Sequence, residues 1–192
     1  MTDIIDTLSG IVPGSKGEAL RARRPVTKDG AQASWQALFA PVDDSQFSIG
    51  ERFAVAVFVA GLHGQSEIAA FYGEKLAANP ALLTAVQTAA SKGTAIGPYG
   101  HYPAGPLSSE NSEGPDFAVT EREKTILGAR LAAALEHAHL LIFHLRDAKP
   151  QALDALLKAG WSTTGIVTLS QLISFLAFQI RVVAGLKVLN AA

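Results

Sequence analysis

Histidine and glutamate side chains gather on one stretch of the chain, and these are the groups best suited to chemistry. His137, His139 and His144 fall within eight residues of one another, and Glu136 directly precedes the first. On a helix, Glu136 and His139 are three positions apart and can share a face. Neutral imidazole takes up protons near pH 7 and a carboxylate can fix its tautomer, so the pair suits acid and base catalysis. The alternative is a buried hydrogen-bond network between subunits.

A fourth histidine stands alone at an expected junction between two helices. His63 is bracketed by Gly61 and Gly64 and is followed by an expected helix start. Both an acid or base role and a capping or packing role are open for it, whereas His101 lies in a loop and is expected to be solvated. The candidate catalytic residues are therefore His63, Glu136, His137 and His139.

The sequence predicts neither a metal site nor a cofactor. His137 and His144 are seven positions apart, roughly 10 Å along a helix, which is too far for one metal ion. The chain has no HExxH spacing and no cysteine at all. The absence of cysteine excludes thiolate metal sites, disulfides and thiol redox chemistry.

The final helix, expected over residues 163–189, predicts the substrate-binding residues. On a helical wheel one half is wholly apolar: Leu169, Leu172, Ile173, Leu176, Ala177, Ile180, Val183 and Ala184. The other half carries uncharged polar groups, aromatic rings and one arginine, which indicates a subunit interface or a cavity wall. A desolvated Arg181 needs an anionic partner, either Glu136 or a carboxylate ligand. The candidate substrate-binding residues are Arg181, Gln171, Gln179 and Ser174.

Length and composition indicate a single domain. The 192 residues are 48% hydrophobic, the net charge is −1, and no segment alternates as a strand does, so we predict an all-α fold without nucleic-acid or membrane partners. Residues 1–45 should form a helical arm, with helices at 3–9 and 31–39 and with Pro25 ending the helix that precedes it. Residues 46–92 form a first repeat, 93–118 a Gly/Pro loop and 119–192 a second repeat.

The chain start and one uncharged run bear on location. The start MTDIIDTLSG lacks a signal peptide, so a cytoplasmic location is expected. Residues 161–180 carry no formal charge and are long enough to span a bilayer. Their many Ser, Thr and Gln residues favour instead a buried helix of a soluble oligomer.

Two capping boxes suggest an internal duplication. Ser48 and Glu51 precede FAVAVFVAGLHG, and Thr120 and Glu123 precede ILGARLAAALEHAHLL. These features, together with the closing run DALLKAGWSTTGIVTLSQLISFLAFQIRVVAGL, resemble the carboxymuconolactone decarboxylase and alkylhydroperoxidase D-like superfamily over nearly the whole chain. The arm IVPGSKGEALRARRP is most similar to a cysteine-free subgroup of decarboxylase-domain proteins. The resemblance implies a helical bundle with a duplicated unit and a homo-oligomer, whether dimer, trimer or hexamer.

The superfamily that the chain resembles has two branches with different chemistry. The peroxidase branch places cysteines at the twelfth and fifteenth residues after a glutamate and a histidine four further on. At these intervals this chain has His63, Ser66 and Ala70 after Glu51, and Leu135, Ala138 and Ile142 after Glu123. Thiol peroxidase activity is therefore not expected. The lactone-decarboxylase branch relies on Glu and His, which this chain retains.

Two functions remain open at this point, and the sequence leaves open whether the protein is an enzyme. One is cofactor-free acid and base chemistry on a small anionic substrate held by Arg181. The other is a non-catalytic oligomeric companion of a cysteine-bearing, peroxidase-like relative.

Overall fold

The structure, a computed structural model, describes residues 3–191, and every regular element in that range is helical. This confirms the predicted all-α fold. An antiparallel bridge between Gly100 and Ser112 is the sole β-type contact of the described chain. The α-helices are α1 Ile4–Ser9, α2 Lys16–Ala22, α3 Pro25–Phe39, α4 Ile49–Leu62, α5 Ser66–Gly73, α6 Pro80–Gly93, α7 Glu121–Phe143, α8 Pro150–Lys158 and α9 Thr163–Ala191.

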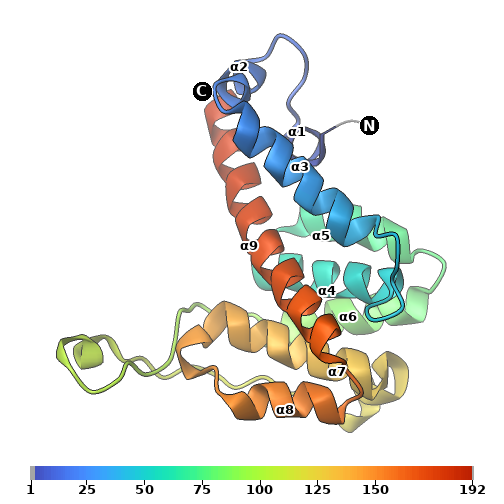
Figure 1. Ribbon diagram of the computed structural model, residues 1–192, viewed down its shortest axis with the longest axis vertical. Helices are drawn as coiled ribbons and strands as arrows, with labels where there is room; N and C mark the ends of the chain where they lie inside the picture. Colours follow the sequence, from blue (N-terminus) through green and yellow to red (C-terminus); the bar gives the residue numbers. More distant parts are fainter. Residues whose placement is uncertain (1–2, 192) are drawn as a thin grey trace.

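Helix α9 is the longest helix and contacts both the body and the arm of the molecule. Its 29 residues extend roughly 43 Å at 1.5 Å per residue. Its first half packs on α4, α7 and α8, and its second half packs on the arm formed by α1, α2 and α3 (Figure 1). The apolar half predicted for this helix faces the core, because Leu169, Leu172 and Leu176 are fully buried. The arm is therefore attached to the body through α9.

Helix α4 is the centre of the core. Residues 54–60 are all apolar and at most 1% exposed, as expected of a helix that is hydrophobic on every side. It contacts α5, α6, α7 and α9. The polar residues of α4 therefore lie near its two ends, with Arg52 near the start and His63 at the C-cap.

Both predicted capping boxes are present. Ser48 accepts from the amide of Glu51, whose carboxylate accepts from the Ser48 amide at 3.0 Å. Thr120 and Glu123 make the same exchange, with 2.9 Å between the carboxylate and the Thr120 amide. The start of each helix is thus fixed by its local sequence.

Two helix boundaries differ from the prediction. Pro25 begins α3 rather than only ending the helix before it, because the first helical position needs no backbone N–H. The start expected at residue 31 is therefore wrong by six residues. In α7, Gly128 has φ 76° and ψ 154°, so residues 121–127 and 129–143 form two helical segments. The predicted second repeat therefore begins with a helix interrupted at Gly128, unlike α4.

The predicted loop over residues 93–118 is largely irregular and projects from the body (Figure 1). A short 3₁₀ turn, Pro106–Glu110, lies at its tip. Its base is attached to the end of α7, where the Tyr99 amide donates to the Phe143 carbonyl at 2.6 Å and the His101 amide donates to Asp147 at 3.1 Å.

By length and composition alone, α7 and α9 could each cross a bilayer. Buried residues make up 50% of the most apolar stretch of α7 and 39% of that of α9. Core helices of a folded bundle have the same length and composition, so these two helices do not by themselves assign the protein to a membrane.

Replacing Gly128 with Ala should destabilise the protein, although no atom lies within 4 Å of the added methyl group. The cause is the backbone, because φ 76° with ψ 154° is a region almost restricted to glycine, and we expect a loss of about 1–3 kcal/mol. The measurement is urea unfolding followed by circular dichroism.

The matched control is Gly185→Ala, which lies inside α9 with ordinary helical geometry and equal space. This change should stabilise the protein by roughly 0.5–1 kcal/mol. Equal midpoints for the two variants would contradict the assigned strain.

Candidate functional site

The predicted site residues lie in separate parts of the structure. His63, Arg181 and Ser174 line one recess of about 220 Å³ between the ends of α4 and α7 and the middle of α9. We name it the His63–Arg181 recess. Its remaining walls are Leu141, Ile142, Leu145, Ile173 and Ala177. One predicted catalytic residue and two predicted binding residues therefore meet.

Local backbone geometry places His63 in this recess. His63 caps the C-terminus of α4 and its amide donates to the Val59 carbonyl at 3.2 Å. Gly64 follows with φ 66°, the left-handed conformation that commonly ends a helix. The chain turns there into α5, so the junction predicted around His63 is confirmed.

The imidazole of His63 is electrostatically unusual. Its Nε2 atom is buried and has no hydrogen-bond partner among residues 3–191. Burial, followed by the positive charge of Arg181, lowers the pKa of His63. The ring is therefore neutral at pH 7, with one nitrogen uncommitted to the protein.

Arg181 lies on the exposed side of α9, which corrects the expectation that it is desolvated. Its Nη1 donates to the Ala177 carbonyl at 2.8 Å. Within the described chain it forms no ion pair, with Glu136 or any other acid. It remains able to bind a small anion at the mouth of the recess.

Glu136 and His139 do not form the predicted acid and base pair. The Glu136 carboxylate accepts from the Val119 amide at 2.9 Å. The ring of His139 is buried, bonds to the Gly93 carbonyl at 3.0 Å through Nε2, and stacks on Phe117 with 5.1 Å between ring centroids. Each side chain has a partner outside α7, so sharing a helix did not bring them together.

His137 faces α9. Its Nε2 atom lies 3.4 Å from the Ser170 hydroxyl, and its Nδ1 atom is buried with no partner in the described residues. Burial lowers the pKa of His137, and burial is also the first cause of the lowered pKa of His139. Within one chain these histidines contact a serine and a backbone carbonyl, not each other.

Gln179 is a core residue, not part of an open binding surface. It is 0% exposed, and its Oε1 accepts from the Tyr72 hydroxyl at 2.7 Å. Burial raises the pKa of Tyr72, so the hydroxyl remains a donor. This bond joins α5 to α9 across the core, and it removes Gln179 from the candidate binding residues.

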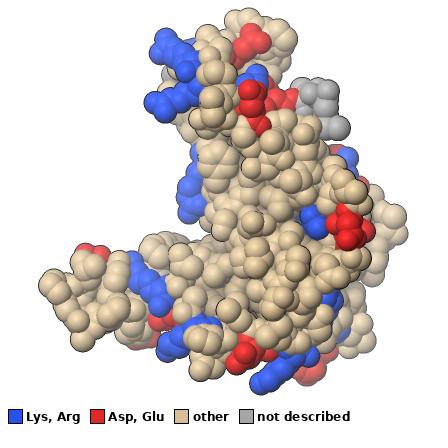
Figure 2. Space-filling view, viewed as in Figure 1, with Lys and Arg blue, Asp and Glu red and all other residues tan. Residues whose placement is uncertain are grey.

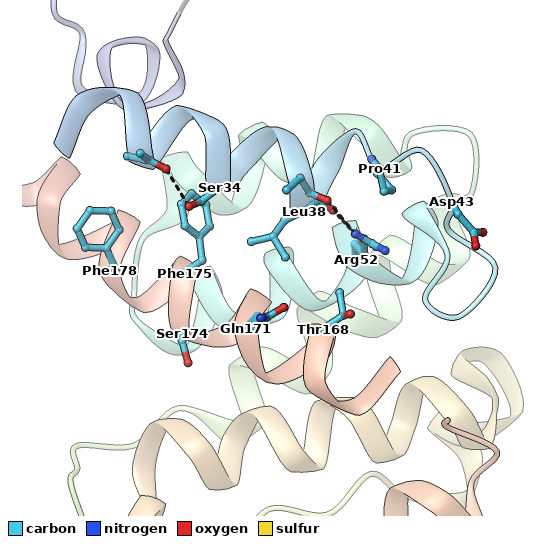
Figure 3. Close-up of a pocket in the computed structure, with 13 residues that line it drawn as sticks. Ser34, Leu38, Pro41, Asp43, Arg52, Thr168, Gln171, Ser174, Phe175 and Phe178 are labelled. Carbon is cyan, nitrogen blue, oxygen red and sulfur yellow. Dashed lines mark hydrogen bonds between the residues drawn. The ribbon is translucent and has the colours of Figure 1, made fainter. Parts of the chain in front are cut away.

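Gln171 lies in a different hollow, and here the structure reveals a residue that the sequence had not singled out. A cavity of about 780 Å³ between α3 and α9 is lined by Gln171 and Ser174 and also by Arg52 (Figure 3). Arg52 is only 4% exposed. The sequence could have indicated Arg52, because it is a charged residue beside Glu51 at the start of an otherwise apolar helix.

No group of three or more histidines, aspartates and glutamates within residues 3–191 is placed to hold a metal ion. No protein-family model, curated protein or solved structure matches this chain. The functional argument therefore depends on the geometry of the recess and the cavity.

Stability should fall as the pH drops below about 6.5, the ordinary pKa of histidine. Burial lowers the pKa of His63, His137 and His139 in the folded protein, so the unfolded chain binds more protons in that range. Each such proton contributes a slope of up to about 1.4 kcal/mol per pH unit. Urea unfolding at pH 7.5, 6.5, 5.5 and 5.0 measures this change of the unfolding free energy with pH.

His137→Gln should flatten that slope, since it removes one of the three groups. Ser170→Ala is the matched control, because it changes the neighbour of His137 without removing a titrating group. If His137→Gln keeps the full slope, the assignment of this titration to His137 is wrong.

Proposed function

We propose that the protein binds a small carboxylate in the His63–Arg181 recess and exchanges a proton with it through His63, without a cofactor. The observation that carries this function is the buried, unbonded Nε2 of His63 in a recess that Arg181 also lines. A neutral imidazole with a free nitrogen is a competent base, and a nearby guanidinium can hold the acid.

The shape of the recess limits the substrate to a small molecule. About 220 Å³ is below the range of roughly 300–1,000 Å³ typical of pockets for drug-sized ligands. Leu141, Ile142 and Ile173 form apolar walls, which strengthen electrostatic interactions with a bound anion. A short-chain acid with an acidic C–H bond matches both features.

The charges also suggest how the proton transfer is controlled. Burial and the positive charge of Arg181 oppose protonation of His63, so its imidazole stays neutral and can act as a base. A bound carboxylate neutralises Arg181 and favours the imidazolium, so uptake of the proton becomes easier once the substrate is present. The expected resemblance to the decarboxylase superfamily is compatible with this proposal, because its lactone-decarboxylase branch uses Glu and His and needs no thiol.

The first test is anion binding, read from the NMR titration of His63 with malonate as the probe. Malonate should raise the pKa of His63 in the wild-type protein. Arg181→Ala should itself raise that pKa, because a positive charge is lost, and should abolish the response to malonate. A response that survives in Arg181→Ala would contradict the assigned binding role.

The second test is proton exchange. Methyl protons of pyruvate should exchange for deuterium faster with the protein than without it, as measured by ¹H NMR in D₂O. His63→Gln should lower the catalysed rate by about 10²-fold or more, the usual contribution of a general base. His101→Gln, in the exposed loop, is the control. An unchanged rate in His63→Gln would remove His63 from catalysis.

One observation favours the second candidate function, an oligomeric companion protein. Large apolar side chains are exposed together on α8 and α9, with Leu153 and Leu157 each 45% exposed and Val167 56% exposed. Figure 2 also shows a broad uncharged area over the middle of the molecule, with charged side chains mainly toward its edges. Contiguous exposed apolar surface is typical of protein interfaces.

We expect native mass spectrometry to show a homo-oligomer, and we expect Val167→Lys to shift it toward monomer by burying a charge in the interface. Val188→Lys, near the other end of α9 and 69% exposed, is the matched control. A monomeric wild-type protein would exclude the oligomeric companion.

A further inference from the structure

The hollow between α3 and α9, which we name the α3–α9 groove, is distinct from the His63–Arg181 recess. We propose that it binds an amphipathic carboxylate, whose head group pairs with Arg52 and whose apolar tail lies over Phe175 and Phe178. Figure 3 shows Arg52 at one end of this groove and Phe178 at the other. The groove and the recess lie on different sides of α9, with Ser174 lining both.

Arg52 is a buried cation that lacks a bonded anion. Its Nε donates to the Phe47 carbonyl at 2.8 Å and its Nη1 to the Leu38 carbonyl at 2.7 Å. No carboxylate of residues 3–191 lies within ion-pair distance of it. Its Nη1 also lies 3.5 Å from the Ala37 carbonyl oxygen. Its Nη2 makes no hydrogen bond in the described chain, and Arg52 lines the groove. One edge of the guanidinium is therefore available to a ligand.

The acids around Arg52 are engaged elsewhere. Asp44 accepts from the Ile49 amide at 3.0 Å, and Glu51 pairs with Arg130 at 2.7 Å. Asp43, at the rim of the groove, accepts from the Ser45 amide and points away from Arg52 in Figure 3. Burial lowers the pKa of Arg52, and the nearby charges of Asp44 and Glu51 offset only part of this effect. A carboxylate at Nη2 would offset the cost of burying this charge.

The wall opposite Arg52 offers a further donor. The Gln171 amide makes no hydrogen bond within the described residues and lines the groove, whereas the Ser174 hydroxyl points away from Arg52 in Figure 3. Gln171 projects from α9 below Leu38 and Arg52 (Figure 3). The Gln171 amide can bind the second carboxylate oxygen directly or through water.

The rest of the groove suits an apolar tail. The Phe175 and Phe178 rings lie 6.3 Å apart, and Phe178 is 40% exposed, which is unusual for an aromatic side chain that packs on a core helix. Beyond Phe178 a second hollow of about 190 Å³ continues between α9 and the arm. Its apolar walls include Ile5 and Leu20, and Arg21, Arg24 and Lys28 also line it. A chain of several methylenes can therefore extend toward the arm.

The charge at Arg52 favours a small ligand over the second copy of this chain that could also cover the groove. An apolar helix face laid over the groove would leave Arg52 buried and unpaired, which is destabilising. A free carboxylate satisfies the cation and covers both phenylalanine rings at once. The experiment below includes the second copy as an outcome.

Isothermal titration calorimetry with octanoate, hexanoate and 1-octanol tests the groove. Octanoate should bind about 15-fold more tightly than hexanoate, because it has two more methylenes and each buried methylene contributes roughly fourfold in affinity. It should also bind at least tenfold more tightly than 1-octanol, which lacks the charge. Arg52→Gln should remove that preference for the carboxylate.

Arg52 also holds the segment between α3 and α4, so its variant can unfold, and a second variant is needed. Ala37→Phe fills the groove from an exposed position on α3 and should abolish octanoate binding. Ala33→Phe, exposed on the same helix outside the groove, should bind octanoate as the wild type does. His63→Gln should likewise leave this binding unchanged, which separates it from the proposed proton transfer.

Two results would overturn the proposal. One is octanoate binding that equals 1-octanol binding or survives Ala37→Phe. The other is a wild-type oligomer that Ala37→Phe dissociates while no carboxylate binds, since the groove would then be an interface between copies.

Discussion

The geometry of both sites depends on one junction, at which Arg130 joins three helices. Its Nε pairs with the Glu51 carboxylate at 2.7 Å, its Nη1 donates to the Gly160 carbonyl at 2.7 Å, and its guanidinium stacks 4.0 Å above the Trp161 ring. The indole of Trp161 donates back to the Arg130 carbonyl at 2.9 Å. The start of α4, the middle of α7 and the turn before α9 are therefore held at fixed positions.

That junction sets α4 against α9, and these two helices supply both sites from their opposite ends. His63 and Arg52 lie eleven positions apart, roughly 16 Å along the helix direction. Helix α9 provides Arg181 opposite the first and Gln171 opposite the second. In the recess the base is buried and the cation is exposed, whereas in the groove the cation itself is buried. The two proposed sites therefore use the same pair of helices.

Local signals in the sequence predicted the elements well, and long-range partners account for what it missed. The caps at Ser48 and Thr120 depend on residues three positions away, so they could be predicted. Gln179 bonds Tyr72 across 107 positions, and no helical wheel contains that partner. Glu136 and His139 share a helix as predicted, but the Val119 amide and the Gly93 carbonyl determine where they point.

Glu51 and Arg52 show why adjacent charges can have unlike roles. Successive helical positions point about 100° apart, so Glu51 reaches Arg130 while Arg52 turns toward the carbonyls of Phe47 and Leu38. Carbonyl groups satisfy the donors of a guanidinium but do not neutralise its charge. The unfavourable free energy of this buried charge is lowered when an anion reaches the open edge of Arg52. The interactions that hold the arm to α4 therefore also prepare the groove for a carboxylate.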